Sequence, residues 1–240
     1  MAPHILRRRL VSIVLAGVSS ALSLLAQSGD TDSSSRRRRM VEQDIAARGV
    51  TNNRVLAALR KIPRERFVPP EMASRAYEDR PLPIGFGQTI SQPFIVAYMT
   101  EVLEIEPAHK VLEIGSGSGY QAAVLGELAQ TVYTIEIVPD LARRAAATLR
   151  ELGYRNVHVR EGDGFAGWPA QAPFDRIMVT AAPSEIPKPL LDQLARGGRL
   201  IIPVGEQGRT QWLTVVDRTS RGLTERRTIP VQFVPFTRRP

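Results

Sequence analysis

The chain of 240 residues contains no cysteine. This absence excludes disulfide bonds, thiolate nucleophiles and zinc sites built on cysteine. Histidine is also scarce: only His4, His109 and His158 occur, and their spacing matches no metal-binding pattern. A Ser-His-Asp arrangement cannot be assembled from them. We therefore expect no metal, and a reaction that needs no strong general base.

Acidic residues are fewer than basic ones: the chain has 24 aspartates and glutamates and 32 lysines and arginines, which gives a net charge of +8. Most of the excess lies in residues 1–39, where seven arginines against Asp30 and Asp32 give +5, so the remaining chain carries only +3. In that remainder, basic and acidic side chains are interspersed and form no stripe. The pattern favours a solvated basic surface over a nucleic-acid groove, and we expect no nucleic-acid partner.

The apolar run at residues 10–26 is shorter than the roughly 20 residues of a membrane-spanning helix. Arginines precede it, and residues 27–39 are polar and end in Arg36–Arg39. This order is typical of a signal peptide or short anchor, although positive charge after an apolar run favours cytoplasmic retention. We expect residues 1–39 to be a signal-like or anchor segment plus a disordered linker, with membrane contact through residues 5–26. A cytoplasmic location is expected, with an exported or tethered protein, or an unused leader, as alternatives.

The second half of the chain alternates between strand and helix patterns. Strands are predicted at residues 110–114, 131–137, 156–160, 176–181 and 199–204, and helices at 119–129, 140–152 and 189–196. Such alternation indicates a parallel sheet with helices on both faces. Two further apolar runs, at 212–217 and 228–234, predict a final antiparallel pair. The expected fold is therefore α/β, doubly wound, with a mostly parallel seven-stranded sheet.

The region before this alternation reads differently. Residues 40–80 are predicted to be mainly helical, with Asn52 or Asn53 as a cap and Pro63 as a helix end. Residues 80–87 are too rich in proline and glycine for regular structure. We expect one domain over 40–240, in which 40–109 form a helical N-terminal part and 110–240 an α/β core.

The most informative motif is a glycine-rich turn after the first strand of the core. Glu113 lies at the end of an apolar run, and Gly115, Gly117 and Gly119 follow at alternate positions. Glycine lets the chain turn tightly and lets a ligand approach the main chain. The nicotinamide fingerprint has glycine where this chain has Tyr120, and the Lys-Ser/Thr ending of a phosphate-binding loop is missing. The spacing indicates a cofactor with a ribose but no pyrophosphate; a tight turn without ligand is the alternative.

Carboxylates follow the strands that flank this turn. Glu136 ends the second strand and can accept two hydrogen bonds from a ribose diol. Glu113 can orient an ammonium group of the cofactor, directly or through water. Asp163 and Gly164 follow the third strand, where Asp163 can accept a hydrogen bond from an adenine amine. The alternatives are solvated strand ends for the glutamates and an Asx turn for Asp163.

Ser91 immediately precedes a helix that opens with Gln92 and Pro93. Its hydroxyl is placed to cap that helix, which is a purely structural role. A helix N-terminus also offers free amides and partial positive charge to an anion. The two roles are compatible, and the residues alone leave both open.

Several further segments carry specific motifs. They are residues 82–85, 87–93, 111–120, 162–164, 174–175, 179–183, 186–187, 197–198, 203–205 and 233–235. In these segments, between about residue 40 and Thr237, the chain resembles the protein-L-isoaspartate (D-aspartate) O-methyltransferase family. The Gln88–Pro93 motif is the specific part and is complete, whereas the glycine turn is shared by many methyltransferases.

The resemblance implies a class I, Rossmann-like methyltransferase that uses S-adenosyl-L-methionine and no metal. Its expected reaction is methyl transfer to the free α-carboxylate of L-isoaspartyl, and also D-aspartyl, residues in damaged proteins and peptides. The ester then forms a succinimide that reopens partly to normal aspartate. Isoaspartyl-containing proteins are the implied partners, and we expect a monomer.

The resemblance also assigns roles to residues. Ser91 matches the active-site serine, and Thr237 matches a further family position. The implied cofactor contacts are Thr89, Ile90, Ser91, Glu113, Gly115, Gly117, Gly119, Glu136, Asp163 and Gly164. The implied substrate contacts are Ile84, Gly85, Gln88, Ser91 and Val234. Three rival functions have less support. The Gln88–Pro93 motif argues against a methyltransferase for small molecules or nucleic acids, and Tyr120 argues against a nicotinamide oxidoreductase. Only the N-terminal segment favours a non-catalytic envelope protein that binds damaged peptides.

Overall fold

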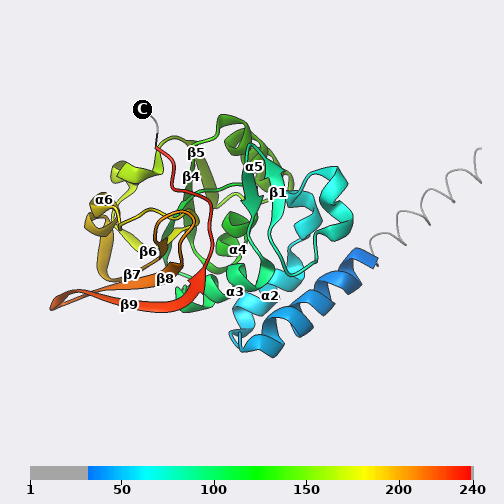
Figure 1. Cartoon of the computed structure of the whole chain (residues 1–240), viewed down its shortest axis with the longest axis horizontal. Coiled ribbons are helices and arrows are strands. Elements are labelled where there is room, and N and C mark those ends of the chain that lie inside the picture. Colours follow the sequence, from blue (N-terminus) through cyan, green and yellow to red (C-terminus); the bar gives the residue numbers. More distant parts are fainter. Residues whose placement is uncertain (1–31, 239–240) are drawn as a thin grey trace, which may run out of the picture.

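A computed structural model describes residues 32–238 of the chain. A seven-stranded sheet forms its centre, with strand order β5-β4-β3-β6-β7-β8-β9 (Figure 1). The strands are β3 (Lys110–Ile114), β4 (Thr131–Glu136), β5 (Val157–Glu161), β6 (Phe174–Val179), β7 (Leu194–Val204), β8 (Gln211–Thr219) and β9 (Gly222–Val231). β3 to β7 pair in parallel, while β8 runs antiparallel to both β7 and β9. The predicted fold class and the antiparallel C-terminal pair are confirmed.

The sheet is buried on both faces, which explains the continuous apolar runs in its central strands. On β3, Val111 packs into the core shared with the larger helices, whereas Leu112 and Ile114 pack into a second core on the other face. The first face carries α2 (Asn53–Lys61), α3 (Pro93–Val102), α4 (Tyr120–Leu128) and α5 (Pro139–Glu151), and the second carries α6 (Lys188–Asp192). The parallel strands therefore end together at one edge of the sheet, where their loops can form a site.

The N-terminal part is more regular than the sequence indicates. Residues 32–39 are helical, so the linker prediction is wrong for them, and residues 1–31 lie outside the described part. The chain continues through η1 (Met40–Ile45), η2 (Ala46–Arg48), η3 (Arg64–Phe67) and η4 (Pro70–Arg75). Met40, Val41 and Ile45 are buried in the same core as β3, and this burial holds the segment against the domain. Asn52 caps α2, as predicted, by accepting hydrogen bonds from the amides of Arg54 and Val55.

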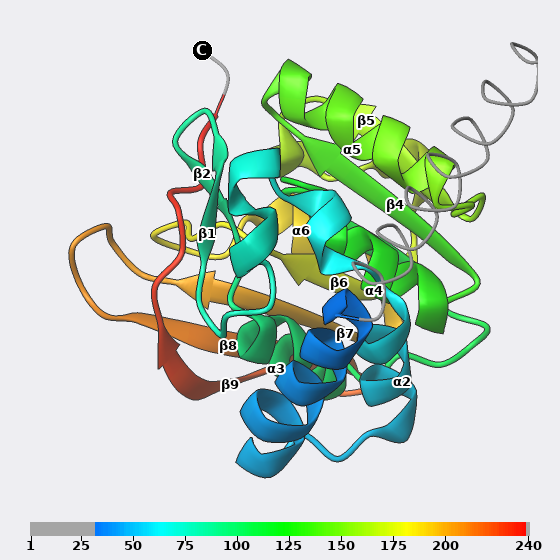
Figure 2. The same cartoon turned by 90° about the vertical axis from the view of Figure 1, so that its right-hand side faces the viewer.

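The proline- and glycine-rich stretch at residues 80–87 was expected to be irregular, which is wrong. β1 (Leu82–Gly85) and β2 (Gln88–Ile90) form a two-stranded antiparallel sheet. Glycine makes the tight turn between them possible, because Gly85 and Gly87 have φ angles of +92° and +69°. In Figure 2 this hairpin lies beside the C-terminal segment, residues 232–238, which runs past it.

Three boundaries near the C-terminus differ from the predictions. The helix expected at 189–196 ends at Asp192, because the Gln193 side chain bonds to Trp168 and Ala166 and the chain then enters β7. The strand expected at 176–181 spans Phe174–Val179. β9 begins at Gly222 rather than near residue 228, since its antiparallel ladder with β8 continues to the turn.

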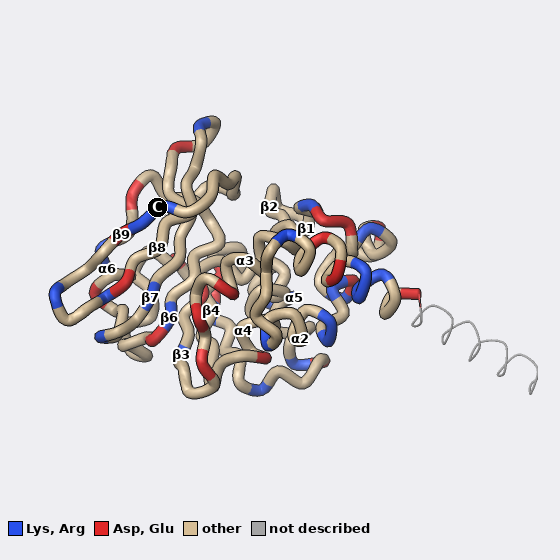
Figure 3. The backbone as a smooth tube through the Cα atoms, turned by 90° about the horizontal axis from the view of Figure 1, so that it is seen from below, with Lys and Arg blue, Asp and Glu red and all other residues tan. Residues whose placement is uncertain are grey.

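Lysines and arginines are interspersed with acidic residues along the described chain, as in the sequence (Figure 3). Within residues 32–238, no helix combines the length and apolarity needed to cross a membrane.

Candidate active site

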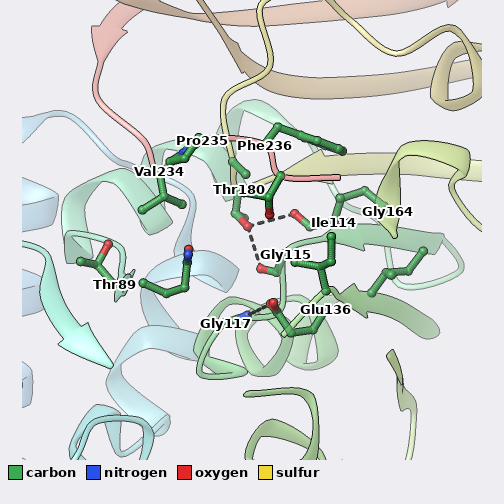
Figure 4. Close-up of a pocket in the computed structure, with 15 residues that line it drawn as sticks. Thr89, Ile114, Gly115, Gly117, Glu136, Gly164, Thr180, Val234, Pro235 and Phe236 are labelled. Carbon is green, nitrogen blue, oxygen red and sulfur yellow. Dashed lines mark hydrogen bonds between the residues drawn. The ribbon is translucent and has the colours of Figure 1, made fainter. Parts of the chain in front are cut away.

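The glycine turn after β3 forms the floor of a cavity. Gly115, Gly117 and Gly119 all have positive φ angles, of +96°, +51° and +89°, which L side chains rarely adopt. At Gly115, a Cβ atom would lie 2.4 Å from Thr180 Oγ1. The Thr180 hydroxyl reaches the carbonyls of Ile114 and Gly115 at 2.9 and 2.7 Å and joins β6 to the turn (Figure 4). The turn thus exposes main chain, and only glycine fits there.

Gly119 has a different role from the one expected. It lines none of the cavities described here, and a Cβ atom on it would lie 3.2 Å from the Cβ of Ala145 in α5. The third glycine therefore allows close packing of two helices. A direct cofactor contact is not supported by this geometry.

Glu136 lies beside the turn with only 5% of its surface exposed. One carboxylate oxygen accepts a hydrogen bond from the Gly117 amide at 2.7 Å, and the other accepts from the Val138 amide at 3.0 Å. A carboxylate oxygen has further acceptor capacity, so both oxygens can still receive a ribose hydroxyl. Figure 4 shows this side chain at the cavity beside Gly117, where the prediction places a diol.

The cavity is a space of about 560 Å³. Its lining comes from the turn, the strand ends, the hairpin and the C-terminal segment: Gln88, Thr89, Ile114, Gly115, Gly117, Ile135, Glu136, Ile137, Gly164, Thr180, Ala181, Val234, Pro235, Phe236 and Thr237. The lining combines apolar side chains with polar side chains and exposed glycine main chain. Such a lining suits a ligand with a flat apolar part and a small number of hydroxyls.

A second, larger space of about 1380 Å³ opens beside this cavity. The two spaces share Thr89, Thr180 and Val234, and the second also contacts Ser91 and Gln92. A small hollow joins Ser91 to Gly115 and Gly117. Ser91 therefore lies between the larger cleft and the glycine turn that forms the floor of the cavity.

Ser91 does not cap the following helix, so the structural alternative is wrong. The cap position of α3 is Gln92, and the first free amide, that of Phe94, donates to Asp79 at 2.9 Å. The Ser91 carbonyl accepts a hydrogen bond from Arg64 at 2.8 Å. Because Asp79 satisfies the helix end, the Ser91 hydroxyl is left for a ligand.

Glu113 is fully buried and lines none of these spaces. Its carboxyl group accepts a hydrogen bond from Thr134, whose hydroxyl also bonds to Ser116 at 2.6 Å. Burial raises the pKa of Glu113 to about 8. Of Glu113, Thr134 and Ser116, only Ser116 lines the hollow beside Ser91. Glu113 can therefore act on a ligand only indirectly.

Asp163 adopts the Asx geometry that was the alternative to ligand binding. Its Oδ1 accepts from the Phe165 amide at 2.9 Å, and its Oδ2 pairs with Arg238 at 2.9 Å. Gly164 does line the cavity, and a Cβ there would lie 2.3 Å from Ile114. The adenine contact of Asp163 stays a prediction, whereas Gly164 is placed as expected.

The expected substrate residues separate into two groups. Gln88, Ser91 and Val234 line the cavity or the cleft. Ile84 and Gly85 do not: Ile84 is 2% exposed, and its carbonyl accepts a hydrogen bond from Arg144. These two residues shape the hairpin rather than face the open cleft.

Of the expected cofactor residues on the hairpin, Thr89 borders all three spaces and Ile90 borders the hollow. Thr180, Pro235 and Phe236 also line the cavity, but the sequence analysis assigned them no role. Thr180 could have been found, because it follows the strand beside the glycine turn.

Phe236 carried no such signal, and Pro235 carried one only through the resemblance at residues 233–235. They reach the cavity because Ala182 bonds to Val234 and Phe236 across the chain, at 2.9 and 3.0 Å. These contacts between distant segments leave no mark on the local sequence.

The histidines in the described residues lie outside the site. His158 packs on Tyr133, with ring centres 5.2 Å apart, and His109 accepts a hydrogen bond from the Glu106 amide. Within residues 32–238, no group of three or more potential ligands could hold a metal ion.

Comparison with known proteins identifies the family. A model of protein-L-isoaspartate(D-aspartate) O-methyltransferase matches residues 35–240. The chain is 63% identical over 199 residues to a protein-L-isoaspartate O-methyltransferase of Gloeobacter violaceus, covering 83% of this chain and 97% of that protein. It is 57% identical over 200 residues to one of Picosynechococcus sp., covering 83% and 89%.

Comparison with solved structures indicates the same family. A protein-L-isoaspartate O-methyltransferase superposes with a TM-score of 0.75 and 30% identity over 82% of this chain, which spans 65% of that chain. A Plasmodium falciparum beta-aspartate methyltransferase in complex with S-adenosyl-L-homocysteine gives a TM-score of 0.74 and 25% identity, over 85% and 99% of the two chains. This chain belongs to the protein-L-isoaspartate(D-aspartate) O-methyltransferase family.

Proposed function

We propose that this chain transfers a methyl group from S-adenosyl-L-methionine to the free α-carboxylate of L-isoaspartyl residues, and to the side-chain carboxylate of D-aspartyl residues. The observation that carries the proposal is the position of Ser91 between the glycine turn, which forms the floor of one cavity, and a larger neighbouring cleft. Family membership supports the same reaction, as do the names of the curated relatives.

The cavity above the glycine turn fits the cofactor. Its floor is glycine main chain, which lets a ligand approach closely. Glu136 offers acceptor oxygens for a ribose, and Ile114 and Ile135 offer apolar walls for a base. When bound, the cofactor supplies an electrophilic methyl group. The relative from Plasmodium falciparum, solved with S-adenosyl-L-homocysteine, supports this assignment.

The open cleft fits a peptide. Ile95, Val231 and Phe233 offer half-buried apolar surface along it, while Arg209 is the one charged residue among its lining residues. A peptide chain lying there would bring one side chain towards Ser91. This cleft is the larger of the two spaces, which suits residues on both sides of the modified position.

The chemistry needs no general base from the protein. A main-chain-type carboxylate has a pKa of about 3.3–3.7, so it is already an anion at neutral pH. The lining of the cleft holds no histidine, aspartate or glutamate that could withdraw a proton. A single hydroxyl at Ser91 can orient the carboxylate without over-stabilising a charge that disappears as the ester forms. The ester then closes to a succinimide, which begins the repair of the peptide.

A transfer assay tests this proposal. The full-length protein is given labelled S-adenosyl-L-methionine and two peptides that differ only in an aspartyl or isoaspartyl linkage. We expect base-labile label on the isoaspartyl peptide alone, and a rate about 10–100-fold lower for Ser91→Ala because the carboxylate is less well positioned. Equal labelling of both peptides, or none, would reject the proposed substrate; an unchanged Ser91→Ala would reject the role of that hydroxyl.

We further propose that the protein acts as a monomer in the cytoplasm, where its methyl donor is made. The arginines at positions 36–39 support retention, whereas the apolar run at 10–26 supports export or tethering. Mass spectrometry of the mature N-terminus distinguishes these cases. An intact N-terminus in the soluble fraction is expected; cleavage within residues 1–39, or recovery in membranes, would contradict it.

A further inference from the structure

Ser91 lies in a short connection that neither a sheet nor a helix holds in place. The ladder between β1 and β2 ends with the pairing of Leu82 and Ile90, and α3 begins at Pro93. Ser91 and Gln92 therefore need other contacts to fix their position. Those contacts come from a buried arginine and a nearby aspartate.

Arg64 is the buried arginine. It is fully inaccessible to solvent, and its Nε donates to the Ala76 carbonyl and its Nη2 to the Ser91 carbonyl, both at 2.8 Å. Its Nη1 has no hydrogen-bond partner among the described residues. Burial lowers the pKa of Arg64 to about 10, so the side chain stays charged at neutral pH. A charge held at this cost, with only carbonyls as acceptors, points to a role beyond packing.

The same guanidinium connects Ser91 to the glycine turn. Its central carbon lies 4.7 Å from the ring centre of Tyr120, the first residue of α4. Tyr120 follows Gly119 directly and is itself 1% exposed. Arg64 thus touches both the residue that faces the substrate cleft and the helix that starts beside the cofactor cavity.

Asp79 holds the other side of the connection. Its Oδ1 accepts from the Phe94 amide at 2.9 Å, and its Oδ2 accepts from the Gln92 side chain at 2.7 Å and pairs with Arg48 at 2.7 Å. Gln92 and the start of α3 are therefore fixed through one aspartate. Asp79 and Ala76 belong to the same loop, so the two anchors are coupled.

We propose that Arg64 and Asp79 are positioning residues that clamp the Ser91–Gln92 connection and thereby set the distance between the Ser91 hydroxyl and the cofactor cavity. The inference rests on the proposed function, because it concerns the same serine. Neither residue lines the cavity or the cleft, so both act through Ser91 rather than on a ligand.

Double-mutant cycles test the clamp. Arg64→Lys keeps the charge but loses the forked pair of donors, and Asp79→Asn keeps the shape but loses the charge. For each variant, we expect kcat with the isoaspartyl peptide to fall about 10–100-fold, because a misplacement of the reacting group by about 1 Å has an effect of this size. The Kd for S-adenosyl-L-homocysteine should change less than about threefold. In a Ser91→Ala background, the same substitutions should change kcat by less than about threefold, because the hydroxyl they position is gone.

Arg66→Lys and Glu78→Gln are the matched controls. They alter neighbouring exposed residues whose ion pairs, with Glu151 and with Arg75 and Arg80, lie away from Ser91. Both should retain wild-type kcat. If Arg64→Lys does not fold, the Asp79→Asn cycle decides by the same criteria.

Equal losses in the wild-type and Ser91→Ala backgrounds would overturn the clamp, as would parallel losses of cofactor affinity, because both indicate general damage to the fold. Absence of transfer by the wild-type protein would overturn the clamp and the proposed function together. If the wild-type protein transfers the methyl group but the effects of the two substitutions in each cycle are additive, the clamp alone would be overturned.

Discussion

At the scale of single residues, the site depends on a few polar groups whose hydrogen bonds are already defined by the protein. Glu136 both organises the glycine turn, through the Gly117 amide, and faces the cavity. Ser91 is free of the capping role that its sequence position suggests, since Asp79 takes it. Both Glu136 and Ser91 therefore keep acceptor or hydroxyl groups that face a cavity or cleft.

Glu136→Ala tests the ribose assignment. Loss of hydrogen bonds to a charged acceptor should weaken S-adenosyl-L-homocysteine binding by about 1–3 kcal/mol, measured by calorimetry. Glu151→Ala, which removes an exposed carboxylate on α5, serves as the control and should leave the affinity unchanged. An unaltered dissociation constant for Glu136→Ala would reject the assignment.

Glu113 makes the stability of the fold depend on pH. The pKa of Glu113 is about 8 in the folded chain, compared with an ordinary value of 4.5, because burial disfavours the charged form of the carboxyl group. Between these values the unfolded chain releases a proton that the folded chain keeps, so the free energy of unfolding falls as the pH rises. The slope from this one group is at most about 1.4 kcal/mol per pH unit.

We expect Glu113→Gln to remove this contribution. Denaturant unfolding at pH 5 and pH 8.5 should show a larger loss of stability in the wild type than in the variant. A variant that loses as much stability as the wild type over this interval would show that Glu113 is not the group responsible.

At the scale of elements, the site is assembled from loops that the sheet brings together at the carboxyl ends of its strands. β3 and β4 supply the turn and Glu136, β6 supplies Thr180, and the hairpin and the C-terminal segment close the cavity from the opposite side (Figure 4). The C-terminal segment is held by main-chain bonds to Ala182 and by the pair between Arg238 and Asp163. No single element contains the site.

Packing between α4 and α5 limits the size of the side chain at Gly119. Gly119→Ala adds a methyl group where φ is +89° and where Ala145 leaves only 3.2 Å. We expect the free energy of unfolding to fall by about 1–3 kcal/mol, measured by denaturant unfolding. Because Gly119 does not line the cavity, the affinity for S-adenosyl-L-homocysteine at low temperature should change less than about threefold. A large loss of affinity in a protein of unchanged stability would restore the cofactor role.

At the scale of the whole molecule, the sequence was sufficient to predict the sheet and to place the glycine turn and Glu136 at the cavity. The alternation of apolar strands and amphipathic helices predicted the parallel sheet, since burial on both faces leaves a distinct local pattern. The glycine turn and Glu136 were found because each lies at a strand end, which is where ligands bind in such sheets.

Other features depend on contacts between distant segments. Residues 32–39 are helical although their run of arginines resembles a linker, and the hairpin at 82–90 forms in spite of its prolines and glycines. Phe236 reaches the cavity only because Ala182 binds the C-terminal segment. Local sequence does not encode these interactions, so they could not be read before the structure.

If cofactor and substrate meet at Ser91, a crystal structure with S-adenosyl-L-homocysteine and an isoaspartyl peptide will show both ligands there. We expect the nucleoside along Gly115 and Gly117, with its ribose on Glu136. We expect the peptide carboxylate beside the Ser91 hydroxyl, facing the sulfur with room for one methyl group. A nucleoside bound outside this cavity, or a Ser91 hydroxyl turned away from the peptide carboxylate, would contradict this arrangement.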